Sequence, residues 1–426
     1  MYSKFLNILP RLENSLLFLV ILFLPTQLGK HFWPDFSFIY SLRIDYLSPT
    51  IYFWDLLVAG LITIFCANSF IKKQIPTLNS KYIFFLLFFL LTQSMSILIA
   101  SNPEGSLVRL KEYLVAGLFG LYLASKPFGG IKRLFYWTLT LSVLLTCLLA
   151  ITQFLLGHSL GLWVLGERNF SISTPLIAKF NFYEHVFLRP YATFPHPNML
   201  SAFLVLTLPI VLIGIPSKFN RLKQMFGLLI SGTVFITFSR PGLFLITLQT
   251  ILLFRRFWKL LLILGVIIAP LLVVRFVSVF TFDTLAVLRR QELSDYAITA
   301  FLQNPLAGIG LNNFINVLAA DKVLVGTSRF LQPVHNIFLL VLAETGLLGF
   351  IGLLGLLITA IISNFKRKDQ LSKVLLGNLF MIIFLGFFDH YFLTLPQGQR
   401  LFFLILGLSF AKRLNNSLNT RESERQ

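Results

Sequence analysis

Charged residues and cysteines are both scarce in this chain of 426 residues. Asp, Glu, Lys and Arg make up 12% of the sequence, against roughly 25% in soluble domains. The two cysteines, Cys66 and Cys147, both lie in apolar stretches, which argues against a disulfide framework and against a cysteine metal cluster. Because 56% of the residues are hydrophobic, the shortage of charge predicts an integral membrane protein.

Acidic residues are fewer than basic ones, and the formal net charge is +19. In a soluble protein this charge would suggest nucleic acid, but here the basic residues gather in short clusters between apolar runs. The clusters fall within residues 4–11, 72–81, 126–133, 218–223, 255–259, 366–373 and 412–425. The positive-inside rule predicts that all of them, and both chain termini, are cytoplasmic. The clusters then meet membrane lipid head groups, and no nucleic acid is needed as a partner.

Twelve apolar stretches have about the length that a membrane-spanning helix needs. They are residues 12–28, 51–70, 82–100, 106–124, 134–156, 197–216, 224–239, 241–254, 258–278, 335–363, 372–392 and 399–411. The first has no small-residue cleavage site behind it, so we interpret it as a retained helix. The sequence therefore predicts an all-α polytopic integral membrane protein, with one transmembrane domain over residues 1–426.

The long loops fall on the extracytoplasmic side of this topology. Residues 157–196 and 279–334 are expected to carry short helices and to form the cap of an active site, with a helix over residues 283–303. Residues 415–426 are expected to be a disordered cytoplasmic tail.

Several arginines lie at the predicted outer ends of spans. Arg189 precedes the sixth span, Arg240 separates two short ones, Arg290 lies in the long loop and Arg400 begins the last span. An arginine at such a depth is costly unless it faces a cavity or an anion. The nearby acids, Glu344 and Asp389, are too few to pair with all four. The surplus indicates an anionic ligand, and phosphate suits the planar fork of Arg best.

His335 and Asn336 enter the tenth span on the same side, and an imidazole there can move protons near neutral pH. Simpler interpretations stay open. Arg189 and Arg400 could extend to the interface, His196 could shape a turn between two prolines, and His335 could be an interfacial residue before a packing helix. Three charged residues in the fourth span could pair with one another, namely Arg109, Lys111 and Glu112.

Four short motifs resemble those of the O-antigen ligase and polymerase family of bacterial envelope proteins. The first is H-N-x9-G-x-x-G, and the second is R-x-x-x-T-F-x-H-P-N, which contains His196 and Asn198. The third is Ser239-Arg240, and the fourth is P-x-x-G-x-G at residues 305–310. The motifs follow the family's order over residues 185–411. The chain departs from the pattern at Phe244 and at Ser294, where family members often carry other residues.

This resemblance implies a glycosyltransferase of the bacterial cytoplasmic (inner) membrane with an extracytoplasmic active site. The donor would be a glycan on polyprenyl (undecaprenyl) pyrophosphate, and the acceptor a hydroxyl of a lipid, a glycan or a protein. We expect Arg189 and Arg240 to hold the pyrophosphate and His335 to act as the base, with inversion at the anomeric carbon. Arg290, Arg400, Asn336, His196 and Asn198 are expected to bind substrate. No cofactor is expected, and the outer loops carry no dense acidic cluster for Mg²⁺, so the reaction is expected to be metal-independent.

Other functions stay open at this point. A ligase and a surface polysaccharide polymerase differ only in the acceptor. A small-anion (bicarbonate-type) transporter would show interrupted helices in two matching halves, and a lipid flippase would carry charges through the whole bilayer.

Overall fold

A computed structural model describes residues 2–73, 76–182, 184–254, 285–321 and 331–413, together with residues 259, 262, 263, 265, 266, 269, 273 and 275–277. Most of the predicted span 258–278, and all of the predicted tail 415–426, lie outside the described residues.

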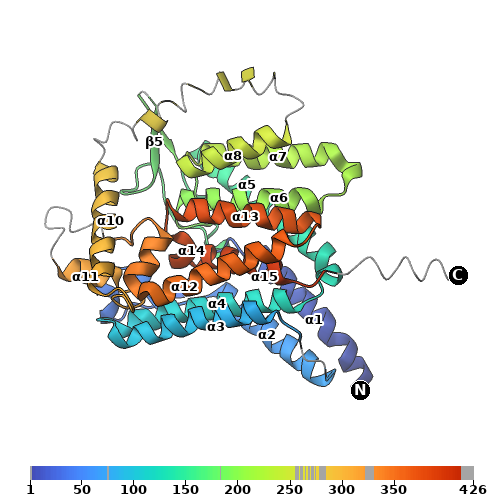
Figure 1. Ribbon diagram of the computed structural model, residues 1–426. Coiled ribbons are helices and arrows are strands. Elements are labelled where there is room, and N and C mark those ends of the chain that lie inside the picture. The colour runs from blue at the N-terminus through green and yellow to red at the C-terminus, as the bar shows by residue number, and fades with distance from the viewer. Residues whose placement is uncertain are drawn as a thin grey trace.

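Helices make up most of the described chain. The long ones are α1 (Tyr2–Leu22), α2 (Phe53–Ile71), α3 (Ser80–Ser96), α4 (Pro103–Ser125), α5 (Phe128–Leu156), α6 (Pro197–Gly214), α7 (Asn220–Ile236), α8 (Arg240–Leu253), α12 (Ile337–Phe365), α13 (Gln370–Gly386) and α15 (Pro396–Phe410). Figure 1 shows them lying side by side in one bundle. Across one end of the bundle lie α10 (Leu285–Gln303) and α11 (Phe314–Ala320), and the short α14 (Tyr391–Thr394) precedes α15.

Five described helices are long and apolar enough to cross a membrane, and α8 and α13 are shorter apolar helices. The five comprise α2, α5, α6, α12 and the stretch from α3 to Ile99. The chain is therefore a largely α-helical membrane protein, while the twelve predicted spans are not all confirmed. The predicted span 372–392 is too long, because α13 ends at Gly386 and the chain turns at Phe387 and Phe388 before α14.

Small β-ribbons accompany the helices, and the described chain is otherwise mostly helical, which is consistent with the predicted all-α membrane fold. Each ribbon is a two-stranded antiparallel pair: β1 (Gly29–His31) with β4 (Thr50–Tyr52), β2 (Phe38–Ile39) with β3 (Leu42–Arg43), and β5 (Lys179–Phe182) with β6 (His185–Leu188). The loop 157–196 was expected to carry short helices, and it carries one short 3-10 helix, Trp163–Leu165, together with the β5–β6 hairpin. The other long loop does carry helices, α10 and α11, and α10 lies close to the predicted 283–303.

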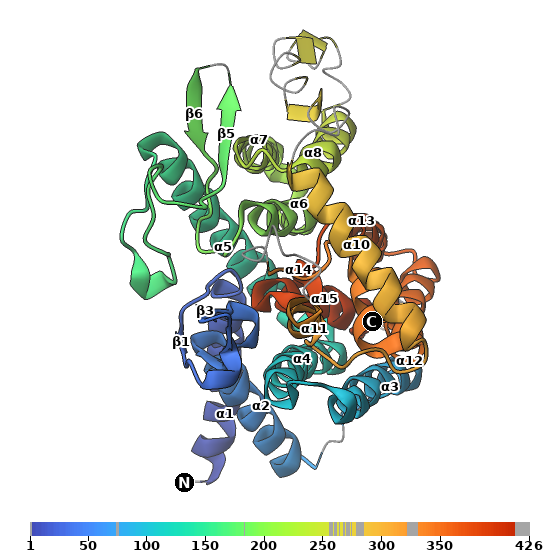
Figure 2. The same cartoon turned by 90° about the vertical axis from the view of Figure 1, so that its left-hand side faces the viewer.

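The basic loops meet at the end of the bundle opposite α10. Phe128 N donates to the carbonyl of Lys412 at 2.8 Å, Arg367 donates to the carbonyl of Ser409 at 3.0 Å, and Lys126 pairs with Glu13 of α1. The two ends of the bundle thus differ. One end carries basic loops, and the other carries the cap, which is formed by α10, α11 and the β5–β6 hairpin (Figures 1 and 2).

Helix α15 lies at the centre of the bundle, with its residues buried from Gln397 to Phe410. Its Gly407 packs directly on Gly120 of α4, where an added Cβ would come within 2.5 Å of the Gly120 carbonyl oxygen. Such small pairs let apolar helices approach closely. The same holds between α12 and α3, where Gly352 and Gly355 face Phe89 and Phe85. The flank of glycines predicted for this helix is therefore a packing face.

Gly346 interrupts α12 with a left-handed backbone (φ 63°). The loop 304–310 fills the break: Ile309 N donates to the carbonyl of Ala343 at 2.9 Å, and Gly310 N to that of Glu344 at 2.8 Å. In return, Leu347 N donates to the carbonyl of Pro305 at 2.8 Å. Backbone groups freed by a broken helix must find partners inside a membrane protein. The loop supplies them, and it thereby fixes α10 over α12.

Replacing Gly346 with Ala should destabilise the protein by roughly 1–3 kcal/mol or more, because a left-handed alanine is strained and its Cβ would also meet the backbone of Leu306 and Ala307. Thermal unfolding in detergent measures the change. Gly377→Ala is the control, because Gly377 lies within helix α13 and has no atom near an added Cβ. That variant should be neutral or more stable by about 0.5–1 kcal/mol. Equal melting temperatures for the two variants would contradict the role of the break.

Candidate functional site

Arg189 is buried just before α6 and is held by two hydrogen bonds. Its Nε donates to the carbonyl of Thr237 at 2.6 Å, and one terminal nitrogen donates to Asn198 Oδ1 at 2.7 Å. Burial, with the charges of Arg240 and Arg290, lowers the pKa of Arg189 to about 10. The guanidinium group therefore stays charged at neutral pH. It is anchored within the protein, and it does not extend to the interface.

Asn198 connects this arginine to an acid. Its Nδ2 donates to Asp389 Oδ2 at 3.0 Å, while the other carboxylate oxygen accepts from the backbone N–H of His390 at 2.9 Å. Burial opposes ionisation of Asp389, but its neighbours His390, His335 and Arg290 lower its pKa to about 2. Asp389 is thus a buried carboxylate that faces positive and polar groups.

Two histidines lie beside this carboxylate. The rings of His335 and His390 are 5.1 Å apart between centroids and inclined by 68°. His390 Nδ1 lies 2.5 Å from Thr394 Oγ1, and its Nε2 lies 3.9 Å from Asp389 Oδ1. The Nδ1 atom of His335 is buried and has no hydrogen-bond partner among the described residues. Burial lowers the pKa of His335 to about 3 and that of His390 to about 4, although Asp389 raises both. Both rings are therefore neutral at pH 7.

Three further arginines complete the group. Arg240 is the first residue of α8, and its Nε donates to the carbonyl of Arg275 at 3.1 Å. Arg275 Nε in turn donates to the carbonyl of Phe238 at 2.8 Å. Arg290 lies on α10 in the cap, and its charge acts on Arg189, Arg240 and Arg275. Guanidinium groups from distant parts of the chain thus gather in one region, and the charge of Arg290 also acts on both histidines.

Three of the predicted binding residues have other contacts. Arg400 is buried in the bundle, where it donates to the carbonyl of Thr26 at 2.6 Å and lies over the Trp54 ring at 4.6 Å. Asn336 caps α12, because its Oδ1 accepts from the N–H groups of Phe338 and Leu339. His196 caps α6 through its Nδ1, although it lies close enough to act on His335.

Sequence reasoning missed two members of the site, Arg275 and His390. Each lies inside a stretch that was predicted to span the membrane, 258–278 and 372–392. The rule that singled out Arg240, that a charged or titratable residue within a span is a candidate functional residue, would have found both.

The charged residues of α4 form ion pairs and hydrogen bonds beside this site. Arg109 pairs with Glu112 at 2.6 Å and donates to the carbonyl of Thr394 at 2.5 Å, while Lys111 pairs with Asp55 at 2.8 Å. The predicted pairing inside the group is thus confirmed for Arg109 and Glu112 and wrong for Lys111. Because Thr394 contacts His390, Arg109 fixes the short helix α14 on which the second histidine depends.

His335, Asp389 and His390 also offer ligand atoms that lie within 4.8 Å of one another, a composition that suits a transition-metal ion. Arg290 lies close enough for its positive charge to act on all three. That charge opposes a cation and favours an anion. The predicted absence of a metal stays a prediction.

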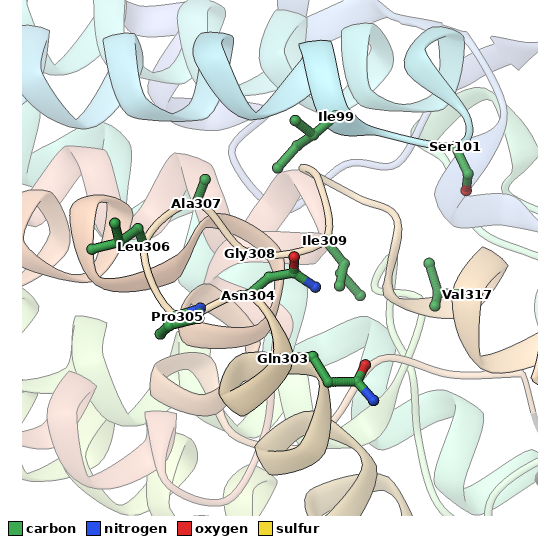
Figure 3. Close-up of a pocket in the computed structure, with 10 residues that line it drawn as sticks. All are labelled: Ile99, Ser101, Gln303, Asn304, Pro305, Leu306, Ala307, Gly308, Ile309 and Val317. Carbon is green, nitrogen blue, oxygen red and sulfur yellow. The ribbon is translucent and has the colours of Figure 1, made fainter.

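A separate cavity of about 540 Å³ lies on the capped end (Figure 3). It is lined by Ile99, Ser101, Gln303, Asn304, Pro305, Leu306, Ala307, Gly308, Ile309 and Val317. None of the predicted site residues is among them. Ile309 and Val317 pack on the apolar cluster that also contains Val334, the neighbour of His335. The loop that fills the break in α12 therefore forms one wall of this cavity.

The fold and the site define an α-helical membrane protein with arginines and histidines gathered beneath a cap. Residues 225–354 match a family model described as O-antigen ligase. This match supports the O-antigen ligase/polymerase family and confirms the resemblance predicted from the motifs. It includes Arg240, Arg275, Arg290 and His335, whereas Arg189, Asn198, Asp389 and His390 lie outside the matched residues. No curated protein matches the chain.

Replacing Asn198 with Ala should lower thermal stability. The substitution leaves buried Arg189 and Asp389 without the amide between them, and a hydrogen bond to a charged group contributes about 1.5–3 kcal/mol. Detergent-solubilised protein can be compared by its melting temperature with an Asn181→Ala control, since Asn181 is exposed on β5. Equal melting temperatures for the two variants would show that the Asn198 amide does not stabilise the fold.

Proposed function

We propose that this protein transfers a glycan from polyprenyl pyrophosphate to an acceptor hydroxyl. The observation that carries this proposal is the group formed by Arg189, Arg240, Arg275 and Arg290, because the charge of Arg290 acts on the other three arginines and also on His335. The match to the O-antigen ligase family supports ligase or polymerase chemistry in general, and the donor, the acceptor and the stereochemistry are part of our proposal.

The arginines would bind the pyrophosphate of the donor. As the bond between the anomeric carbon and the pyrophosphate oxygen breaks, negative charge grows on that oxygen. Fixed guanidinium groups at this position stabilise the transition state, and a single donor of this kind can contribute about 3–4 kcal/mol. Arg189 is suited to this role because its Nε is held by a main-chain carbonyl while it remains charged.

His335 would remove the proton of the acceptor hydroxyl as the oxygen attacks the anomeric carbon. Attack from the face opposite the pyrophosphate inverts that carbon, and the proton moves to the imidazole. Asp389 is a positioning residue in this scheme, because its negative charge stabilises the imidazolium that forms. Asn336 fixes the start of α12 directly after the base.

The sidedness of the site follows from charge. The basic loops lie at the end of the bundle opposite the cap, and the positive-inside rule assigns such loops to the cytoplasm. The proposed site is then extracytoplasmic in the bacterial inner membrane, and both termini are cytoplasmic.

A polymerase that extends a growing glycan stays an equal alternative, because it differs only in the acceptor. A small-anion transporter is favoured by one observation, the interruption of α12 at Gly346. Here the loop 304–310 occupies the freed backbone groups, so they are not open to an ion. We therefore prefer the enzyme.

Replacing His335 with Gln should lower transfer by roughly 10²–10⁴-fold, the usual contribution of a general base. The assay incubates purified protein with lipid-linked oligosaccharide and measures released polyprenyl pyrophosphate. His185→Gln serves as the control, because His185 is exposed on the β5–β6 hairpin. A fully active and well-folded His335→Gln protein would remove the base from the mechanism, and release of no pyrophosphate by the wild type would favour a transporter.

The two kinetic parameters should respond differently to acid. In the free protein, burial lowers the pKa of His335 to about 3, so kcat/KM should not lose its base until far below pH 6. A bound pyrophosphate brings negative charge that favours the imidazolium, which raises the pKa in the complex. The acid limb of kcat should therefore lie at higher pH than that of kcat/KM. If the acid limbs of kcat and kcat/KM lay at the same pH, this would contradict a base beside the pyrophosphate.

A further inference from the structure

A second cavity, of about 790 Å³, lies between α6, α7, α8 and α13. Its walls include the last turns of α6 and α8 and the first turns of α7 and α13, so it lies at the end of the bundle that carries the basic loops. Its volume falls in the range of small-molecule sites. The mechanism above uses none of its residues.

The walls of this cavity divide into an apolar and a polar part. The apolar part comprises Leu208, Pro209, Leu212, Ile213, Gly227, Leu252, Leu253, Phe254 and Val374. The polar part comprises Asn220, Lys223, Gln224, Gln249 and Gln370. Leu252 and Leu253 are 65% and 45% exposed, so the apolar wall opens on the side that the bilayer would cover. The cavity thus matches a lipid, because it also has a polar region beside an apolar one.

Two polar groups in the cavity indicate an occupant. Lys223 is half-buried, and no acidic partner for it is found within the described part of the chain. Gln249 donates to the carbonyl of Val205 at 3.1 Å, but its buried Oε1 accepts no hydrogen bond from any described residue. A buried polar atom without a partner is costly. An anion beside Lys223 and a donor beside Gln249 would satisfy both.

We propose that this cavity binds one anionic phospholipid with a hydroxyl-bearing head group, of the phosphatidylglycerol type. Its phosphate contacts Lys223, helped by Gln224 and Asn220, and its glycerol hydroxyl donates to Gln249. One acyl chain lies against the apolar wall. Basic pockets between membrane helices bind anionic head groups in this way. A free phosphate would leave the apolar wall without a partner.

The test measures retained lipid by native mass spectrometry of the full-length protein after detergent exchange, with phosphatidylglycerol or phosphatidylcholine added. We expect the wild type to retain one phosphatidylglycerol and to bind it more tightly than phosphatidylcholine. Inorganic phosphate at the same concentration should not displace the lipid. Equal retention of both lipids would overturn the proposal, and so would displacement by phosphate.

Two pairs of variants locate the site. Lys223→Gln should weaken retention about fivefold, the size of one basic contact to an anionic lipid, while Lys218→Gln should not, because Lys218 lies outside the cavity over the Phe219 ring. Gly227→Leu should abolish retention, since its side chain would fill the space in front of Phe254. Gly232→Leu lies on the same helix with nothing near its Cβ, and should retain the lipid.

Two results would contradict this assignment. Undiminished retention by Gly227→Leu would place the lipid elsewhere. Displacement of phosphatidylglycerol by an equimolar polyprenyl phosphate would assign the cavity to the tail of a prenyl lipid. Both readouts are independent of glycan transfer, so the lipid site can fail while the proposed reaction stands, and the reverse.

Discussion

The arrangement of the capped end depends on the exchange of hydrogen bonds between the broken helix α12 and the loop 304–310. A membrane helix can be interrupted only if other groups satisfy its freed backbone amides and carbonyls. Here Ile309, Gly310 and Leu347 close those bonds. Because the loop directly follows α10, the same bonds hold Arg290 above the start of α12, where His335 lies. Two motifs that are far apart in the sequence, P-x-x-G-x-G and the glycines after His335-Asn336, are therefore parts of one structural joint.

The protonation states of the residues in this site depend more on burial than on ion pairing. Burial keeps His335 and His390 neutral, while Asp389 stays ionised near Arg290 and accepts the backbone N–H of His390. The site thus combines permanent positive charge with an unprotonated ring. If the cap admitted bulk water, the guanidinium groups would stay charged, but the imidazole pKa would return toward its ordinary value and the ring would be protonated more readily.

The sequence was sufficient for the class of protein, because scarce charge and apolar runs follow directly from the solvent that the bilayer provides. It also singled out Arg189, Arg240 and His335 as candidate site residues, since a titratable group at the end of an apolar run stands out, and their roles stay predictions. It failed where partners come from elsewhere in the chain. Asn336 and Arg400 were both predicted to bind substrate, and the sequence did not indicate that Asn336 caps α12 or that Arg400 is buried against Trp54. His390 and Arg275 were hidden inside stretches counted as spans, because hydropathy averages a single polar residue away.

Three of the clustered arginines share one feature of geometry. Arg189, Arg240 and Arg275 each use Nε to bind a main-chain carbonyl, at Thr237, Arg275 and Phe238 respectively. The plane of each guanidinium group is then set by the backbone, and its terminal nitrogens keep a fixed spacing. A lysine ammonium also has further donors after it binds a carbonyl, but they rotate on a flexible stem and have no fixed plane. The choice of arginine at these positions therefore encodes a rigid template, whose shape exists before any oxyanion arrives and needs no rearrangement to receive one.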